Sequence, residues 1–167
     1  PPALVPHVFV GHIEGAKALV AIVESEENVV AYTCGQDDDR PTHTGWYYGV
    51  KQAVEGENVQ LVNGSLGLKM RGSIGARGGA GVVTLADGTE KKFTVEPARG
   101  DAGLFDFEDA SQFVGFIRAN DGATAGNKTI RAGVGEAIEP NTLTSAGVTA
   151  TSPPTTTTTT TTTIQPV

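Results

Sequence analysis

The chain has 167 residues, a net charge of −7 and an isoelectric point near 4.9. An acidic surface repels phosphate groups, which argues against a nucleic-acid partner and against binding to anionic lipid surfaces. The single cysteine, Cys34, excludes an internal disulfide and a multi-cysteine metal site, and no apolar run approaches the roughly 18 residues of a membrane-spanning helix.

The first third of the chain predicts four strands. Residues 8–13 (VFVGHI) are rich in β-branched and aromatic side chains, and residues 18–23 (ALVAIV) are continuously apolar, as in a strand covered on both faces. A short acidic turn separates them from residues 29–34 (VVAYTC), which indicates a hairpin. The polar residues 35–44 then predict a loop, and residues 45–50 (GWYYGV) predict the fourth strand.

The middle of the chain continues as short strands with turn signals between them. Residues 59–62 (VQLV) alternate in polarity, Asn63-Gly64 favours a primed turn, and in residues 66–74 we expect Leu66, Leu68 and Met70 on one face. Residues 81–85, 91–97, 103–107, 112–118 and 127–133 predict the remaining strands. Only residues 107–113 (FEDASQF) show a pattern compatible with a helical turn. About nine to eleven short strands, with turns between neighbours, predict an all-β antiparallel meander in which consecutive strands pair. An up-and-down barrel is preferred over a two-sheet sandwich, because closure of the sheet removes exposed strand edges.

The ends of the chain differ from its middle. We divide the chain into an extension (1–6), a β domain (7–139) and a disordered Thr/Pro-rich tail (140–167). Nine consecutive threonines, Thr155 to Thr163, offer too little apolar surface to fold and are typical either of an O-glycosylated stalk or of an unmodified flexible terminus. The chain begins with Pro1 rather than Met, so we expect either a removed signal peptide, which would make the protein secreted or displayed at the cell surface, or a trimmed sequence.

The glycine-rich residues 72–83 (GSIGARGGAGVV) are interpreted as a mobile hairpin tip rather than as a phosphate loop. A phosphate loop leads into a helix and carries a Lys-Ser/Thr pair, whereas Gly81 is followed by the strand pattern VVTL. Arg77 is the only charge at this tip, so any binding role would depend on that side chain.

No catalytic, cofactor or metal motif is present. Asp37 to Asp39 lack the ligand spacing of a calcium loop, the histidines have no paired spacing, and the Arg99-Gly100-Asp101 tripeptide is interpreted as a turn rather than an adhesion motif. Residues 45–50 form the densest aromatic group, with Trp46 and Tyr48 expected on one face and Tyr47 on the other. Packing in the core is the preferred role for these rings. The sharper hypothesis is a binding patch of Trp46, Tyr47, Tyr48, His43 and Arg77.

Several strings together resemble a group of uncharacterised small exported β-rich proteins of actinobacteria. They are GHIEGAKALVAIVESEENVVAYTCG, GWYYG, GVVTLADGTEKKFTVEPARGDAGLF and FVGFIRANDG, which span about residues 9–122. The loop QDDDRPTHT and the segment GLFDF depart from the pattern of the group, which ends in Tyr-Arg. The resemblance implies export and a β fold, and it assigns no activity, cofactor or catalytic residue.

Three functions remain open from the sequence. The leading one is an exported, non-enzymatic binding module that recognises a protein or an envelope component. The alternative is a lipocalin-like carrier whose hollow interior would be lined by Val20, Ile22, Tyr32 and Phe93. The third is a small hydrolase, which requires His43 beside a carboxylate or hydroxyl in a cleft.

Overall fold

The computed structural model describes residues 7–50, 58–64, 66–108, 112–130, 135–137 and 149–150. Eight strands form a closed barrel in which every neighbouring pair is antiparallel. They are β1 (His7–Ile13), β2 (Ala18–Glu24), β3 (Asn28–Gly35), β4 (Gly45–Val50), β5 (Val59–Asn63), β6 (Leu68–Gly75), β7 (Gly78–Thr84) and β8 (Glu90–Pro97). The predicted meander and its closure into a barrel are confirmed.

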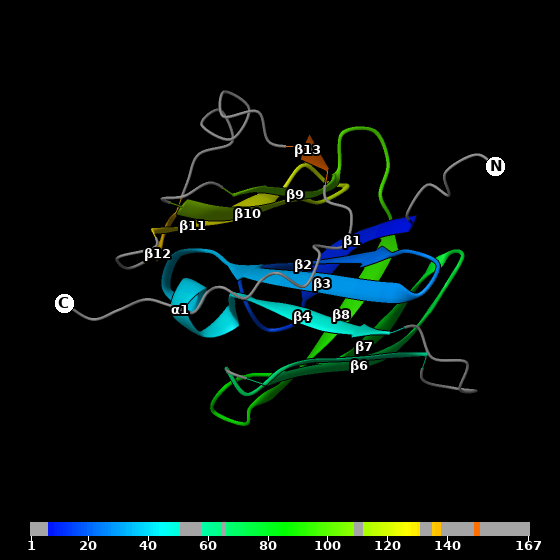
Figure 1. Ribbon diagram of the computed structural model, residues 1–167, viewed down its shortest axis with the longest axis horizontal. Helices are drawn as coiled ribbons and strands as arrows, with labels where there is room; N and C mark the ends of the chain where they lie inside the picture. The colour runs from blue at the N-terminus through cyan, green and yellow to red at the C-terminus, as the bar shows by residue number, and fades with distance from the viewer. Residues whose placement is uncertain are drawn as a thin grey trace.

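The remaining strands form a separate five-stranded sheet in the order β12-β11-β10-β9-β13. Its members are β9 (Gly103–Glu108), β10 (Gln112–Arg118), β11 (Thr124–Ile130), β12 (Gly135–Ala137) and β13 (Thr149–Ala150). This sheet lies over the barrel face formed by β1, β2 and β3 (Figure 1). The fold is therefore a barrel with a second sheet packed against one side, an arrangement that the sequence did not predict.

Closure of the barrel follows from the pairing of its first and last strands. Phe9 lies opposite Pro97 and Ile13 opposite Phe93, so β8 completes the ring that β1 begins. Closure leaves no open edge in the barrel, and Pro97 stands at the end of its strand, where a missing N–H costs the ladder least.

Strands β2 and β3 are buried on both faces. One face of each strand looks into the barrel and the other packs under the second sheet, so every residue from Ala18 to Glu24 is buried. Burial on both faces explains why the sequence of β2 is continuously apolar, as predicted. Tyr32 was expected to line the interior, but it points outward and lies in the cluster between the barrel and the second sheet.

Two short helical segments occupy residues 35–44, where we expected only a polar loop. They are η1 (Asp37–Asp39) and α1 (Arg40–His43), and α1 has a proline in its first turn. We considered a helical turn at residues 107–113, but residues 107–108 end β9 and residues 112–113 begin β10. Residues 109–111 fall outside the described residues. Among the residues that the structure describes, no helix has the length and apolarity to cross a membrane.

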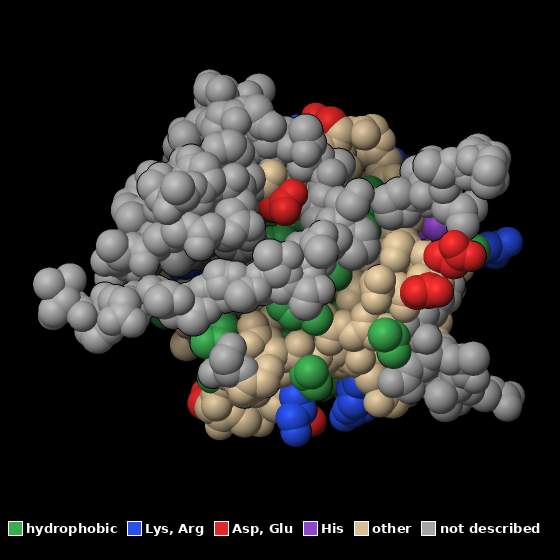
Figure 2. Space-filling model, in the orientation of Figure 1, with side chains coloured by type: hydrophobic (Ala, Val, Ile, Leu, Met, Phe, Trp, Pro, Cys, Tyr) green, Lys and Arg blue, Asp and Glu red, His purple; other side chains and the backbone are tan. Residues whose placement is uncertain are grey.

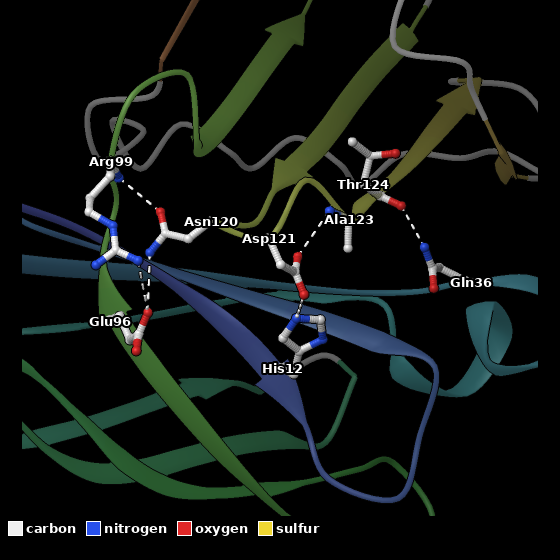
Figure 3. Close-up of polar contacts among 8 residues, drawn as sticks. All are labelled: His12, Gln36, Glu96, Arg99, Asn120, Asp121, Ala123 and Thr124. Atoms are coloured by element: carbon white, nitrogen blue, oxygen red, sulfur yellow. Dashed lines mark hydrogen bonds and ion pairs between the residues drawn. The ribbon is translucent and has the colours of Figure 1, made fainter.

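The connection between β10 and β11 fastens the second sheet to the barrel. Asn120 accepts a hydrogen bond from the backbone N–H of Arg99 (2.9 Å) and donates one to the carbonyl of Pro97 (3.0 Å). In the same turn Asp121 contacts His12 of β1 at 2.8 Å, and Gln36 donates to the carbonyl of Thr124 (Figure 3). These contacts join the turn to β8, to β1 and to Gln36, which follows β3.

Candidate functional site

Large apolar side chains occupy the inside of the barrel. Val20, Ile22 and Phe93 point inward as predicted, and they share one buried cluster with Tyr47 and Met70. An eight-stranded barrel is just wide enough to be filled in this way or to hold one small ligand.

Inward-facing glycines let these side chains pack closely against neighbouring strands of the barrel wall. A Cβ on Gly81 would lie 2.7 Å from the ring of Phe93, and one on Gly45 would lie 2.3 Å from Cδ1 of Leu68. The ring of Phe93 and the Leu68 side chain thus occupy the space that side chains at Gly81 and Gly45 would need. This packing favours a filled barrel over a hollow carrier.

The segment η1–α1 folds over one end of the barrel. The backbone carbonyl of Asp39 lies where a Cβ of Gly35 would be, and the Asp39 carboxylate accepts a hydrogen bond from the backbone N–H of Lys17 (2.7 Å). Directly beneath, Thr33 and Tyr47 form a buried hydroxyl pair at 3.4 Å. Asp37 is exposed and lies 3.6 Å from the Lys17 ammonium, so this part of the acidic triplet is a solvated surface.

His43 is buried in this segment rather than standing in a solvated loop. Its Nδ1 lies 2.7 Å from the Thr42 hydroxyl and 3.2 Å from the Asp39 carbonyl, and the nearest Asp39 carboxylate oxygen is 3.9 Å away. Its Nε2 is buried without a hydrogen-bond partner among the described residues. A hydrolase needs the histidine nitrogen to reach a substrate, and here Nδ1 is engaged and Nε2 is enclosed.

Asp87 in the turn between β7 and β8 lies near this end of the barrel. Its pKa is lowered by the backbone N–H of Thr89, which donates to it at 2.8 Å, and by a hydrogen bond with the Thr89 side chain. His43 lies in the connection from β3 to β4 and Asp87 in that from β7 to β8, so both are at the same end of the barrel.

The three aromatic residues of β4 divide between the two faces of the strand, as predicted. Tyr47 points into the barrel and is fully buried. Trp46 is buried on the outer face, where its ring lies 4.5 Å from that of Tyr32, and Tyr48 packs partly against the same cluster. Core packing, the preferred interpretation, accounts for Trp46 and Tyr47.

Arg77 lies at the other end of the barrel. The glycine-rich stretch forms the β6–β7 hairpin, and Gly75 pairs with Gly78 so that only Ala76 and Arg77 remain in the turn. The hairpin is as predicted, but most of the expected loop is strand. His43 is at the opposite end and Tyr47 is internal, so the five predicted binding residues do not share one surface.

A different surface carries exposed apolar side chains. Val50, Val62 and Leu66 are 57%, 53% and 52% exposed, and Tyr48 lies directly across from Val62. We expected Leu66 to share the buried face of Leu68 and Met70, but it precedes β6 in the turn after β5. These four residues, with Lys69 and Arg71 of β6, are called the β4–β6 outer face.

Hydrophobic and basic side chains lie beside one another on this side of the molecule (Figure 2). Lys69 is the cross-strand partner of Val62, and Arg71 lies 3.7 Å from Glu90. The sequence contained a signal for this surface, because VQLV places valine at an outward position as well as at an inward one.

The structure also places the Arg-Gly-Asp tripeptide and Cys34. In the Arg-Gly-Asp tripeptide, Asp101 pairs with Arg118 at 2.9 Å, Arg99 lies 3.5 Å from Glu96, and Gly100 takes the positive φ of a turn. Cys34 is fully buried, and burial raises the pKa of its thiol. No group of three or more potential metal ligands occurs within the described part of the chain.

Comparison with known proteins adds no relative: no family model, curated protein or solved structure matches the chain.

Proposed function

We propose that this protein is an exported, non-enzymatic module that binds a protein or an envelope component through the β4–β6 outer face. The observation that carries the proposal is the exposure of Val50, Val62 and Leu66 on a barrel whose interior is already packed. Neighbouring exposed apolar residues rimmed by polar ones mark interaction sites.

The second sheet explains why this face, rather than another, is available. It covers the outer sides of β1, β2 and β3 and buries the apolar residues there, including Leu19 and Val30. Val50 of β4 and Val62 of β5 lie past that cover. A partner bound there would therefore bury the outer apolar side chains that the second sheet leaves exposed.

Export and the role of the tail are supported by the sequence. The resemblance to exported actinobacterial proteins and the nine-threonine tract Thr155–Thr163 both suit a protein held outside the cell. We infer that the tract is a stalk or spacer that carries O-linked sugars. Mass spectrometry of protein purified from its source would detect the added hexose masses, and an unmodified tract would overturn the glycosylation.

Site-specific photo-cross-linking in the source organism tests the binding role. A photoreactive amino acid is placed at Val50 or Val62, and in a matched control at Thr94, which is exposed on the outer side of β8. We expect both sites on the β4–β6 outer face to cross-link the same partner, and Thr94 to cross-link none. Equal cross-linking from all three sites, or none from any, would contradict the proposal.

A further inference from the structure

We propose that the β4–β6 outer face binds an extended acidic segment of a partner protein. The inference rests on the proposed function and adds the chemistry of the partner.

The charge of this face is opposite to that of the whole chain. Its cations are Lys69 and Arg71, of which Arg71 is paired with Glu90 at 3.7 Å, whereas the chain as a whole carries a net charge of −7. Complementary charge steers partners and suppresses wrong ones, so an acidic ligand would be drawn to this face and repelled elsewhere.

The register places cations beside the exposed apolar residues. Tyr48, Val62 and Lys69 form one cross-strand row, because Tyr48 pairs with Val62 and Val62 with Lys69. Lys69 has no ion-pair partner among the described residues, whereas Arg71 already faces Glu90. A ligand carboxylate would thus meet the Lys69 ammonium while its neighbouring apolar side chain covers Val62.

Strand geometry favours an extended ligand. Lys69 and Arg71 are two positions apart on the same face of β6, which separates them by roughly 7 Å along the strand. Successive same-side residues of an extended peptide have the same spacing. A segment that alternates acidic and apolar residues would therefore match both the charges and Val50 or Val62.

An anionic membrane is less suited to this surface than a narrow polypeptide segment. A broad anionic surface would also meet the acidic remainder of the molecule, whose charge repels it. A single extended segment can lie along Lys69 and the apolar residues without spanning the acidic remainder of the molecule. Association with a second copy of the chain is the other occupant to be separated by experiment.

The probe is a soluble ten-residue peptide that alternates Glu and Val, titrated into the full-length ¹⁵N-labelled protein. Two matched peptides alternate Gln with Val and Lys with Val. We expect amide shifts at Val62 and Lys69 with the Glu peptide, affinity that weakens as salt is raised, and at least about tenfold weaker binding of the matched peptides.

Two charge-reversal variants distinguish direct contact of the peptide with Lys69 from general electrostatic attraction to the protein. Lys69→Glu should weaken binding of the Glu peptide about tenfold, whereas Arg77→Glu makes the same charge change at the far hairpin and should alter binding less than about twofold. Equal effects of the two variants, or equal binding of the three peptides, would overturn the inference. So would Lys69-dependent binding to vesicles containing phosphatidylglycerol, or a Lys69-dependent dimer in sedimentation.

Failure of this inference differs from failure of the proposed function. If Val50 and Val62 still cross-link a single partner while the Glu peptide fails to bind, the face is a binding site with another chemistry. If cross-linking fails as well, the binding role itself is wrong.

Discussion

Three buried groups with ionisable protons lie within β3 and β4. Tyr47 faces the barrel interior and hydrogen bonds with Thr33, while Tyr32 and Cys34 lie under the second sheet. Burial raises the pKa of all three, and for Tyr32 the neighbouring Cys34 raises it further. Each group is therefore held in its neutral form by the fold.

This arrangement predicts alkaline instability. Because the folded pKa values are raised, the stabilisation is complete below the ordinary thiol and phenol values and is lost as the pH rises through the folded values. Above about pH 9 the free energy of unfolding should fall, by up to about 1.4 kcal/mol per pH unit for each group involved. Urea unfolding followed from pH 7 to 11 measures this slope.

Tyr47→Phe provides the control for the alkaline slope. The variant removes one titrating group and leaves the ring, so its stability should decline less steeply above pH 10 than that of the unmodified protein. A free energy of unfolding that stays constant up to pH 11 would contradict the assignment of these groups to the core.

At the scale of single elements, the β6–β7 hairpin depends on glycine for close approach. A Cβ on Gly81 would meet the carbonyl of Arg71 at 2.2 Å as well as the Phe93 ring, so Gly81→Ala should destabilise the protein by about 1–3 kcal/mol. Gly75→Ala is the matched control in the same hairpin, because no atom lies within 4 Å of the added Cβ. We expect its free energy of unfolding to change by less than about 1 kcal/mol. Equal losses would show that strand conformation, rather than packing, sets the cost.

The turn between β10 and β11 gives a second test. Asn120→Ala removes two hydrogen bonds, one with the backbone N–H of Arg99 and one with the carbonyl of Pro97, at a cost of about 0.5–1.5 kcal/mol each. Gln60→Ala truncates an exposed amide on β5 and should stay within about 0.5 kcal/mol. Chemical denaturation of both variants measures these changes in the free energy of unfolding. A neutral Asn120→Ala would mean that these two hydrogen bonds do not help to hold the second sheet in place.

The elements differ in how far the sequence predicted them. Alternation and turn residues located the barrel strands, and the unbroken apolar run of β2 indicated cover on both faces. Helix α1 was missed because four residues are too few for a periodic pattern, although Pro41 near a helix start was a usable signal. At the β5–β6 connection the sequence placed the turn at Asn63-Gly64, whereas the positive φ belongs to Gly67.

The candidate site was less predictable than the fold for a physical reason. Sequence places aromatic residues on a strand, but which face is covered depends on where a distant sheet packs. Trp46 is buried in the cluster that the barrel shares with that sheet, whereas Val62, an ordinary strand residue by pattern, is left exposed. The proposed binding surface therefore follows from tertiary packing.

At the scale of the whole molecule, the second sheet makes the two halves depend on each other. Leu104 and Ile117 of the sheet pack against Leu19 and Tyr32 of the barrel in one buried cluster. Removing the sheet would expose a broad apolar face on β2 and β3. We infer that barrel and sheet unfold together, because neither can expose this cluster without losing its burial free energy.

Hydrogen exchange should reveal this organisation directly. The amides of β2 and β3 should exchange slowest, because solvent reaches them only when both the barrel and the second sheet open. The β6–β7 hairpin is the internal control: it has the same barrel hydrogen bonding, but its outer side chains, such as Arg71 and Ser73, are exposed to solvent. Slower exchange in β6 and β7 than in β2 and β3 would show that the barrel, and not its contact with the second sheet, is the most stable unit.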